Sequence, residues 1–278
     1  MICCPYAFDR GCGAVCTRLH AIGFGCEMTR DVADAVASIA HSKGRRLPCS
    51  QGEYRTWVST KGAEIWLHYP RSGNDDAASA LDPIDDLKGM TIFQRGSGAI
   101  NMRIHRRMTW ENPLDGVCIA NLPLLKGKGR GMPFVFEQVG FGLDTAAPPY
   151  DARVQLCGLA HRLWAYETER DFLRALPSKR LISRGAIAAM QPDEVRDVGL
   201  IYRTKPGALW LVTGVVLKSI KLRNPLADRD YYWLFLETDR GDIDIVANPA
   251  VIEGDISTGH TVQTVVSVAG RILDRNSI

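Results

Sequence analysis

The sequence predicts an α+β fold that is rich in β-structure, with a βαββ-containing domain at the N-terminus and a small antiparallel barrel after it. Few segments have the apolar spacing of a helix, whereas apolar runs of strand length, separated by glycine, proline or aspartate, recur along the chain. With 278 residues, the chain is long enough for two domains. We expect an N-terminal α+β domain over residues 1–150 and a β-barrel domain over 151–278, with an irregular leader at 1–16.

The N-terminal domain is expected to contain a β-α-β-β unit over residues 19–70. Residues 19–26 alternate loosely between apolar and polar side chains, which indicates a strand. Residues 29–44 have the spacing of an amphipathic helix, and Gly44 can end it. The unit is completed by two strands and the tight turn between them, at 53–60, 63–70 and Lys61-Gly62.

A polar linker is expected over residues 72–89, because this stretch combines serine, aspartate and asparagine with a proline. Beyond it, short apolar segments alternate with turn residues, as in a series of strands. The connection at 126–133 is rich in glycine and carries three basic residues, Lys126, Lys128 and Arg130. The predicted strands begin at Met90 and continue at 100–110, 116–125 and 134–140.

The C-terminal domain is predicted to consist of strands and one short helix. The apolar pattern after residue 151 fits a helix or a strand, and the central Gly158 favours the strand. Glu167 then starts a helix that Pro177 ends. Short connections favour a compact barrel, and glycines in the middle of strands suit its bends. These strands and glycines are 208–222, 231–238, 242–247, 261–274, Gly214 and Gly270.

Two aspartates alternate with isoleucines in the predicted strand at 242–247. Since successive side chains of a strand point to opposite faces, Asp242 and Asp244 should face solvent while Ile243 and Ile245 face the core. The alternative is an ion site, which would need further oxygen ligands from elsewhere in the chain. We expect the solvent-facing arrangement.

Charge and hydropathy favour a cytoplasmic protein. The net charge of +3 is weak for a dedicated nucleic-acid binder. No apolar run approaches the roughly 20 residues that span a bilayer, and the first residues lack the pattern of a secretory signal. Cys12, Cys16 and His20 have a spacing that could place three metal ligands on one helix face, but the glycines beside Cys12 disfavour that helix.

The end of the chain resembles a group of uncharacterised bacterial proteins. The resemblance implies a β-rich fold with a C-terminal OB-like barrel, and it implies no activity. It covers about half of the chain and depends on spacing more than on identity. The residues that carry it are Gly214-Val215, Asn224, the run 231–238, Asp244-Ile245-Val246 and Gly270-Arg271, with weaker similarity at 62–66 and 182–187.

Residues 19–70 resemble one βαββ portion of a vicinal-oxygen-chelate module, the glyoxalase-type fold. In that family a histidine on the first strand and a glutamate on a later strand bind a divalent metal. His20 and Glu64 occupy those positions, so the resemblance implies one divalent metal that polarises the oxygens of a substrate. A complete site of this kind needs two modules, and residues 90–140 lack the family spacing.

Other motifs of catalysis or phosphate binding are absent from the sequence. Two features remain as candidate binding sites. Trp210 and Tyr232 could form a stacking surface for single-stranded nucleic acid on the barrel. The loop with Lys126, Lys128 and Arg130 could contact an acidic partner.

The leading hypothesis is a non-enzymatic cytoplasmic protein, without a cofactor, that acts by binding a protein partner. An immunity or antitoxin-like protein that blocks a bacterial toxin is one specific form of it. The first alternative is a metal-dependent enzyme of the vicinal-oxygen-chelate type, with one divalent metal at His20 and Glu64. The second is single-stranded nucleic-acid binding through the barrel. No role at a membrane is expected.

Overall fold

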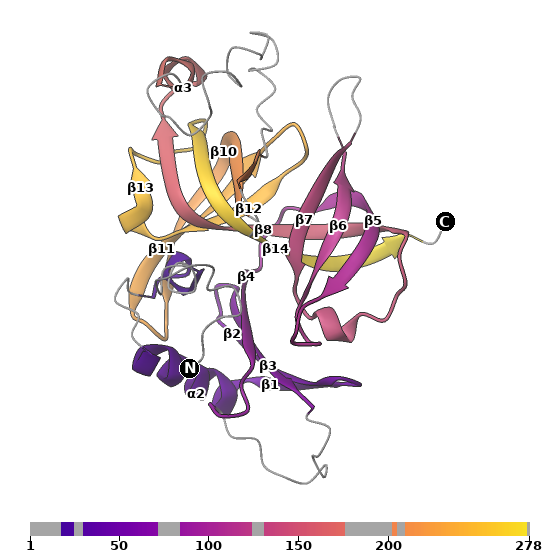
Figure 1. Ribbon diagram of the computed structural model, residues 1–278. Coiled ribbons are helices and arrows are strands. Elements are labelled where there is room, and N and C mark those ends of the chain that lie inside the picture. The colour runs from indigo at the N-terminus through magenta and orange to yellow at the C-terminus, as the bar shows by residue number, and fades with distance from the viewer. Residues whose placement is uncertain are drawn as a thin grey trace.

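The structure is a computed structural model that describes residues 18–24, 30–71, 84–123, 131–175, 202–204 and 209–276. These residues form a four-stranded sheet and a ten-stranded sheet with few helices (Figure 1). The prediction of a β-rich fold of the α+β class is therefore confirmed. No helix in the described part of the chain is long and apolar enough to cross a membrane.

The N-terminal sheet is antiparallel, with its strands in chain order and a helix packed against its two central strands. Buried Ala37 and Ala40 belong to the helix face that joins the core. The hairpin turn at Gly62 has a φ of 90°, a conformation that favours glycine. The elements are α2 (Arg30–Lys43), β1 (Arg45–Cys49), β2 (Gly52–Val58), β3 (Ala63–Pro70) and β4 (Gly89–Gln94).

The β-α-β-β order predicted for residues 19–70 is wrong. Residues 18–21 form a helical turn, and the described chain turns away at Gly23, whose φ is 90°. Leu19 and Ile22 are buried three residues apart, which is a helical spacing that the loose alternation concealed. The first strand is β1, after the helix, which was not among the predicted strands.

The larger sheet contains ten strands, most of which begin and end within a few residues of the predicted bounds. The strand chosen after residue 151 is confirmed as the longest of them, and the short helix follows it. The strands are β5 (Ile100–Thr109), β6 (Gly116–Leu122), β7 (Met132–Gln138), β8 (Tyr150–Tyr166), β9 (Tyr202–Thr204), β10 (Leu209–Asn224), β11 (Arg229–Glu237), β12 (Ile243–Ala247), β13 (Ile252–Glu253) and β14 (Thr261–Asn276); the short helices are η1 (Phe141–Leu143), α3 (Glu169–Ala175) and η2 (Pro249–Val251).

The strand pairings close two rings that share β8 and β14 (Figure 1). These two long strands pair antiparallel along their lengths. The first ring adds β10, β11 and β12, and the second ring adds β5, β6 and β7. Each ring is closed by one parallel pairing, β12 with β8 and β7 with β14, so neither ring is purely antiparallel. The change of sheet falls between β4 and β5, whereas the sequence predicted a domain boundary at residue 150.

The two rings are related by an approximate two-fold axis at the pair Cys157 and Ala269. Three positions to either side of this pair, Val266 faces Ala160 and Ile272 faces Val154. Each long strand then has one unpaired bulge residue, His161 in β8 and Leu273 in β14. The strand order along the chain is also the same, with three antiparallel strands followed by one shared strand.

The hairpin tips of the two rings repeat a sequence motif. Asn-Pro-Leu occurs at 112–114 between β5 and β6 and again at 224–226 between β10 and β11. In both tips the asparagine side chain accepts a hydrogen bond from the leucine two residues later, at 3.0 Å and 2.9 Å. Both asparagines also contact the N-terminal part of the chain, because the amide of Asn224 donates to the carbonyl of Ile22 and that of Asn112 lies 3.4 Å from His68.

Two hydrophobic clusters hold this arrangement together. One fills the rings and contains Phe134, Phe136 and Leu234. The other joins the N-terminal sheet and residues 19–24 to the outer face of the first ring, including Trp233 and Val246. Strands β11 and β12 are therefore covered on both faces.

Candidate functional site

Asp244 is fully buried, so the prediction that it faces solvent is wrong; Asp242 is half-buried. The Asp244 carboxylate accepts four hydrogen bonds, from two backbone N–H groups and two side chains. Burial raises the pKa of this carboxyl, and the hydrogen bonds oppose that rise. The donors are Ser97 N and Gly98 N at 3.1 Å, and Gln155 Nε2 and Trp233 Nε1 at 3.0 Å.

The turn between β4 and β5 explains how a carboxylate can lie between the two sheets. Gly96 and Gly98 let the backbone wrap around Asp244, and a Cβ atom at Gly96 would lie only 2.0 Å from the carboxyl atoms. Ile243 and Ile245 face the ring core as predicted. The opposite face of β12 meets the N-terminal part of the chain instead of water, which is why alternation gave the wrong environment for Asp244.

Glu64 is fully buried in β3 and forms ion pairs with Arg95 and Arg271. Its Oε2 also accepts a hydrogen bond of 2.6 Å from Trp66 Nε1. The Arg271 guanidinium lies 4.7 Å from the centre of the Phe93 ring. This group connects the N-terminal sheet to β14, close to the two-fold axis.

His20 lies on the helical turn at 18–21 and not on a strand. Burial, together with the nearby charge of Arg229, lowers its pKa. Both carboxylate oxygens of Glu64 are already engaged by donors of this chain. Within the part of the chain that the structure describes, no three His, Cys, Asp or Glu side chains converge as metal ligands. Cys12 and Cys16 lie outside that part.

Replacing Glu64 with alanine should lower the free energy of unfolding by about 2–4 kcal/mol, because the partly buried guanidinium of Arg271 would lose its ion-pair partner. Arg95 is more exposed and can be rehydrated, which limits the cost. Glu64→Gln keeps an acceptor oxygen and should cost less. Chemical denaturation measures the free energy of unfolding of both variants.

Elemental analysis of protein purified without chelator tests the metal alternative. One equivalent of divalent metal in the wild-type protein that is lost in Glu64→Ala and in His20→Ala would support a metal site.

A third buried carboxylate, Glu137 at the end of β7, connects three parts of the chain. It accepts hydrogen bonds from Arg18 at 2.5 Å and from the Thr91 hydroxyl at 2.9 Å. Thr91 Oγ1 also lies 3.0 Å from Nε2 of His68. Burial lowers the pKa of His68 to about 3, so this imidazole is neutral at pH 7.

The bulge in β8 directs His161 towards the neighbouring strand. Its Nε2 lies 2.7 Å from Oγ of Ser267 in β14. Burial, with a smaller contribution from the charge of Arg18, lowers the pKa of His161 to about 4. The pair has the geometry of a hydroxyl and a base, but Ser267 is itself buried.

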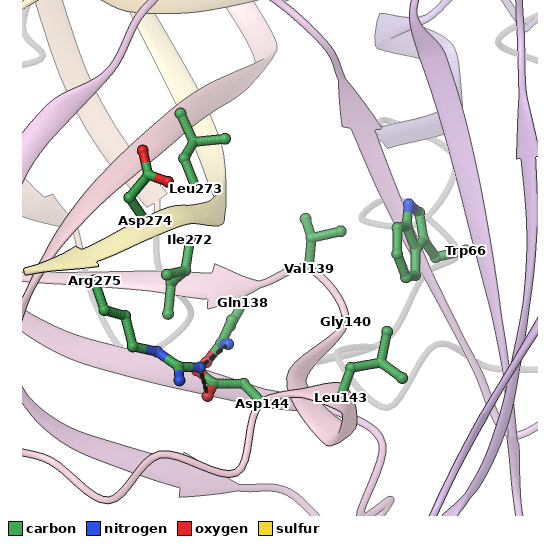
Figure 2. A pocket seen from close by; sticks show the side chains of 10 residues that line it. All are labelled: Trp66, Gln138, Val139, Gly140, Leu143, Asp144, Ile272, Leu273, Asp274 and Arg275. Carbon is green, nitrogen blue, oxygen red and sulfur yellow. Dashed lines mark hydrogen bonds and ion pairs between the residues drawn. The ribbon is translucent and has the colours of Figure 1, made fainter.

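An open cleft of about 530 Å³ lies between the N-terminal sheet and the second ring (Figure 2). Figure 2 shows Trp66 across the cleft from Ile272 and Arg275. Leu143 and Leu273 are 40% and 42% exposed, which is unusual for two leucines of one cleft. The lining residues are Trp66, Gln138, Val139, Gly140, Leu143, Asp144, Ile272, Leu273, Asp274 and Arg275.

The polar end of the cleft is a closed network around Asp144. Its carboxylate pairs with Arg275 and accepts hydrogen bonds from Gln138 and Tyr150 at 3.0 Å and 3.1 Å. Burial alone would raise the pKa of Asp144, but the amide of Ala146, the side chain of Gln138 and the charges of Arg107 and Arg275 outweigh it and hold the pKa below its ordinary value. At the apolar end of the cleft Trp66 and Val139 are buried, whereas Leu143 and Leu273 are exposed.

The binding residues that the sequence suggested do not form one exposed surface among the described residues. Trp210 is only 2% exposed, its ring lies 4.6 Å from that of Phe134, and its Nε1 donates to the carbonyl of Val135. The prediction that it offers a stacking surface is therefore wrong. Tyr232 is half-buried against the ring core. Lys126, Lys128 and Arg130 lie outside the described residues.

The cleft was not predicted from the sequence, because its lining residues come from three distant parts of the chain. The repeated Asn-Pro-Leu motif was a signal for the two related rings, and the glycines at 96 and 98 were a signal for the turn around Asp244. The comparisons with known proteins found no matching family model, no similar curated protein and no similar solved structure.

Proposed function

We propose that the protein is a non-enzymatic binding protein whose ligand is another protein, with an immunity or antitoxin-like inhibitor of a bacterial toxin as its specific form. One observation carries this proposal: the buried carboxylates are committed to donors of the chain itself, while a cleft with two exposed leucines at its apolar end stays open. Asp244 accepts four hydrogen bonds, and Glu64 holds two arginines. Groups that are saturated in this way stabilise the fold and have little capacity left for a substrate.

The order of strands supports an OB-like barrel for each ring. In the first ring β10, β11 and β12 form a meander and β12 is parallel to β8; in the second ring β5, β6 and β7 form a meander and β7 is parallel to β14. In such barrels the face of the second and third strands binds oligonucleotides. In the first ring this is the face of β11 and β12 that residues 19–24 cover. In the second ring, half-buried Ile119 and Val135 and exposed Asn121 and Pro133 carry neither charge nor an aromatic ring. Both features favour a protein partner over a single-stranded nucleic acid.

Protein isolated gently from its native cells should form a stoichiometric complex with one partner protein, visible as a larger mass in size-exclusion chromatography with light scattering. Fluorescence anisotropy with labelled single strands should show no saturable binding at 150 mM salt. A chain that stays at its own mass, and that turns over a small molecule, would contradict the proposal. Binding to single strands that weakens steeply with salt would favour the nucleic-acid alternative.

A further inference from the structure

The four-stranded sheet has one open edge. β1 is the outermost strand at one end of this sheet, and no other strand of the described residues pairs with its outer side. The opposite end, β4, lies against the larger sheet, where the side chain of Gln155 donates to the carbonyl of Gln94 at 3.1 Å. In β1 itself, Arg45, Arg46 and Pro48 are exposed. The outer side of β1 is therefore accessible to another chain.

The β1–β2 hairpin determines which backbone groups of β1 face outwards. In an antiparallel pair, successive residues direct their N–H and C=O groups alternately towards the partner strand and away from it. Pro48 lies opposite Glu53 and has no N–H to donate to β2, which places it at an outward-facing position. Arg46, two residues earlier, faces the same way. The edge thus offers the N–H and C=O of Arg46 and the C=O of Pro48 to an added strand.

The open edge is also basic. Arg46 lies directly opposite Arg55, and both arginines pair with the buried carboxylate of Glu53. The Arg46 side chain is still 64% exposed. Lys43, at the end of α2, and Arg45 are exposed beside it. These four cations outnumber the single carboxylate, so the edge carries a net positive charge.

The open edge borders the cleft. Arg45, Thr56 and Trp66 lie side by side across β1, β2 and β3, and Trp66 lines the cleft. A Cβ atom at Gly142 of η1 would lie 3.5 Å from Sγ of Cys49, at the end of β1. A chain bound along β1 therefore lies beside the cleft with its exposed leucines.

We propose that β1 binds an extended acidic segment of the protein partner, which adds a fifth strand to the four-stranded sheet. Hydrogen bonds to Arg46 and Pro48 hold the backbone of this segment, and its carboxylates face the basic side chains. Positive charge on an edge strand repels the same edge of a second copy, so self-association is disfavoured while an acidic strand is attracted. Phosphate groups of a nucleic acid match the charge but cannot donate to the two outward carbonyls. The inference rests on the proposed function and adds to it the place of contact and the chemistry of the segment.

A labelled peptide of alternating glutamate and valine, Glu-Val-Glu-Val-Glu-Val-Glu-Val-Glu, is the probe. Fluorescence anisotropy with the full chain should show saturable binding at low salt that weakens as salt is added. The same peptide with methylated backbone nitrogens keeps its charges but has no N–H donors. It should not bind, because strand addition depends on main-chain hydrogen bonds.

The double variant Arg45→Gln/Arg46→Gln should weaken peptide binding about tenfold, since each cross-strand ion pair contributes about two- to fivefold. Arg162→Gln is the matched control. Arg162 is 63% exposed and pairs with Glu253, but it lies on β8 between β13 and β14, away from an open edge. It should leave peptide binding unchanged, and thermal melting should show that both variants fold.

Three results would overturn the inference: no saturable binding, equal binding of the methylated peptide, or an equal loss of affinity in the double variant and in Arg162→Gln. Tighter binding of a labelled single strand that the double variant abolishes would also overturn it, in favour of a nucleic acid at this edge. A native partner complex that persists in the double variant would remove β1 as its contact while the proposed function stands. Failure to find any partner would instead remove the proposed function.

Discussion

Replacing Asp244 with alanine should lower the free energy of unfolding by about 4–6 kcal/mol. The change leaves four donors without an acceptor, at Ser97, Gly98, Gln155 and Trp233, and each unpaired buried donor costs roughly 1–3 kcal/mol. The loss is expected to stay below the sum, because the cavity beside Gly96 can admit water. Urea denaturation followed by tryptophan fluorescence measures it, since Trp233 reports directly on this site.

Two neighbours in the same segment serve as controls. Ile245→Ala empties a core position and should cost about 2–5 kcal/mol. Asp242 is half-buried, so Asp242→Ala should cost clearly less than Asp244→Ala. If the two aspartate variants were equally stable, the turn around Asp244 would not hold the sheets together in the way described.

Most strands were predictable because each depends on a local pattern. The run at 231–238 and the alternation at 242–247 both appear as strands within two residues of the expected bounds. The segment after residue 151 is a strand in spite of its helical option, as the central Gly158 indicated. In the structure a Cβ atom at Gly158 would lie 2.5 Å from Ile245, so this glycine also permits close packing of β8 against β12.

The environment of each strand was less predictable, because it depends on what covers the sheet. Alternation identifies two faces of a strand but not whether water or another part of the chain lies on the second face. Asp244 shows this limit, since its face is covered by the N-terminal part of the chain. Trp210 shows the same limit in reverse: its position on β10 points into the ring and not to solvent.

The candidate site was beyond the reach of local patterns. The cleft combines Trp66 of β3 with residues near Asp144 and with the end of β14, and only the closure of the second ring brings these together. His20 was placed on a strand by a loose alternation, whereas it lies on the helical turn at 18–21, where its backbone carbonyl accepts a hydrogen bond from Asn248. The repeated Asn-Pro-Leu motif was the strongest available hint of the underlying symmetry.

Stability should fall by about 6 kcal/mol between pH 7 and pH 4, because buried His68 and half-buried His161 stay neutral in the folded protein. The ordinary pKa of 6.5 is lowered to about 3 for His68 and to about 4 for His161, in both cases mainly by burial. Below pH 6.5 the unfolded chain binds two protons that the folded chain does not, so stability is lost as the pH falls towards the folded pKa values. Such a loss is comparable to the whole stability of many domains.

Equilibrium denaturation in steps from pH 7 to pH 4 measures this dependence. Near pH 5 the free energy of unfolding should change by about 2.7 kcal/mol per pH unit, which corresponds to two protons. His161→Gln should reduce this slope by about 1.4 kcal/mol per pH unit, since it removes one of these two protons. A flat profile between pH 7 and pH 5 would contradict the burial of both imidazoles, and with it the packing of the N-terminal part of the chain against the two rings.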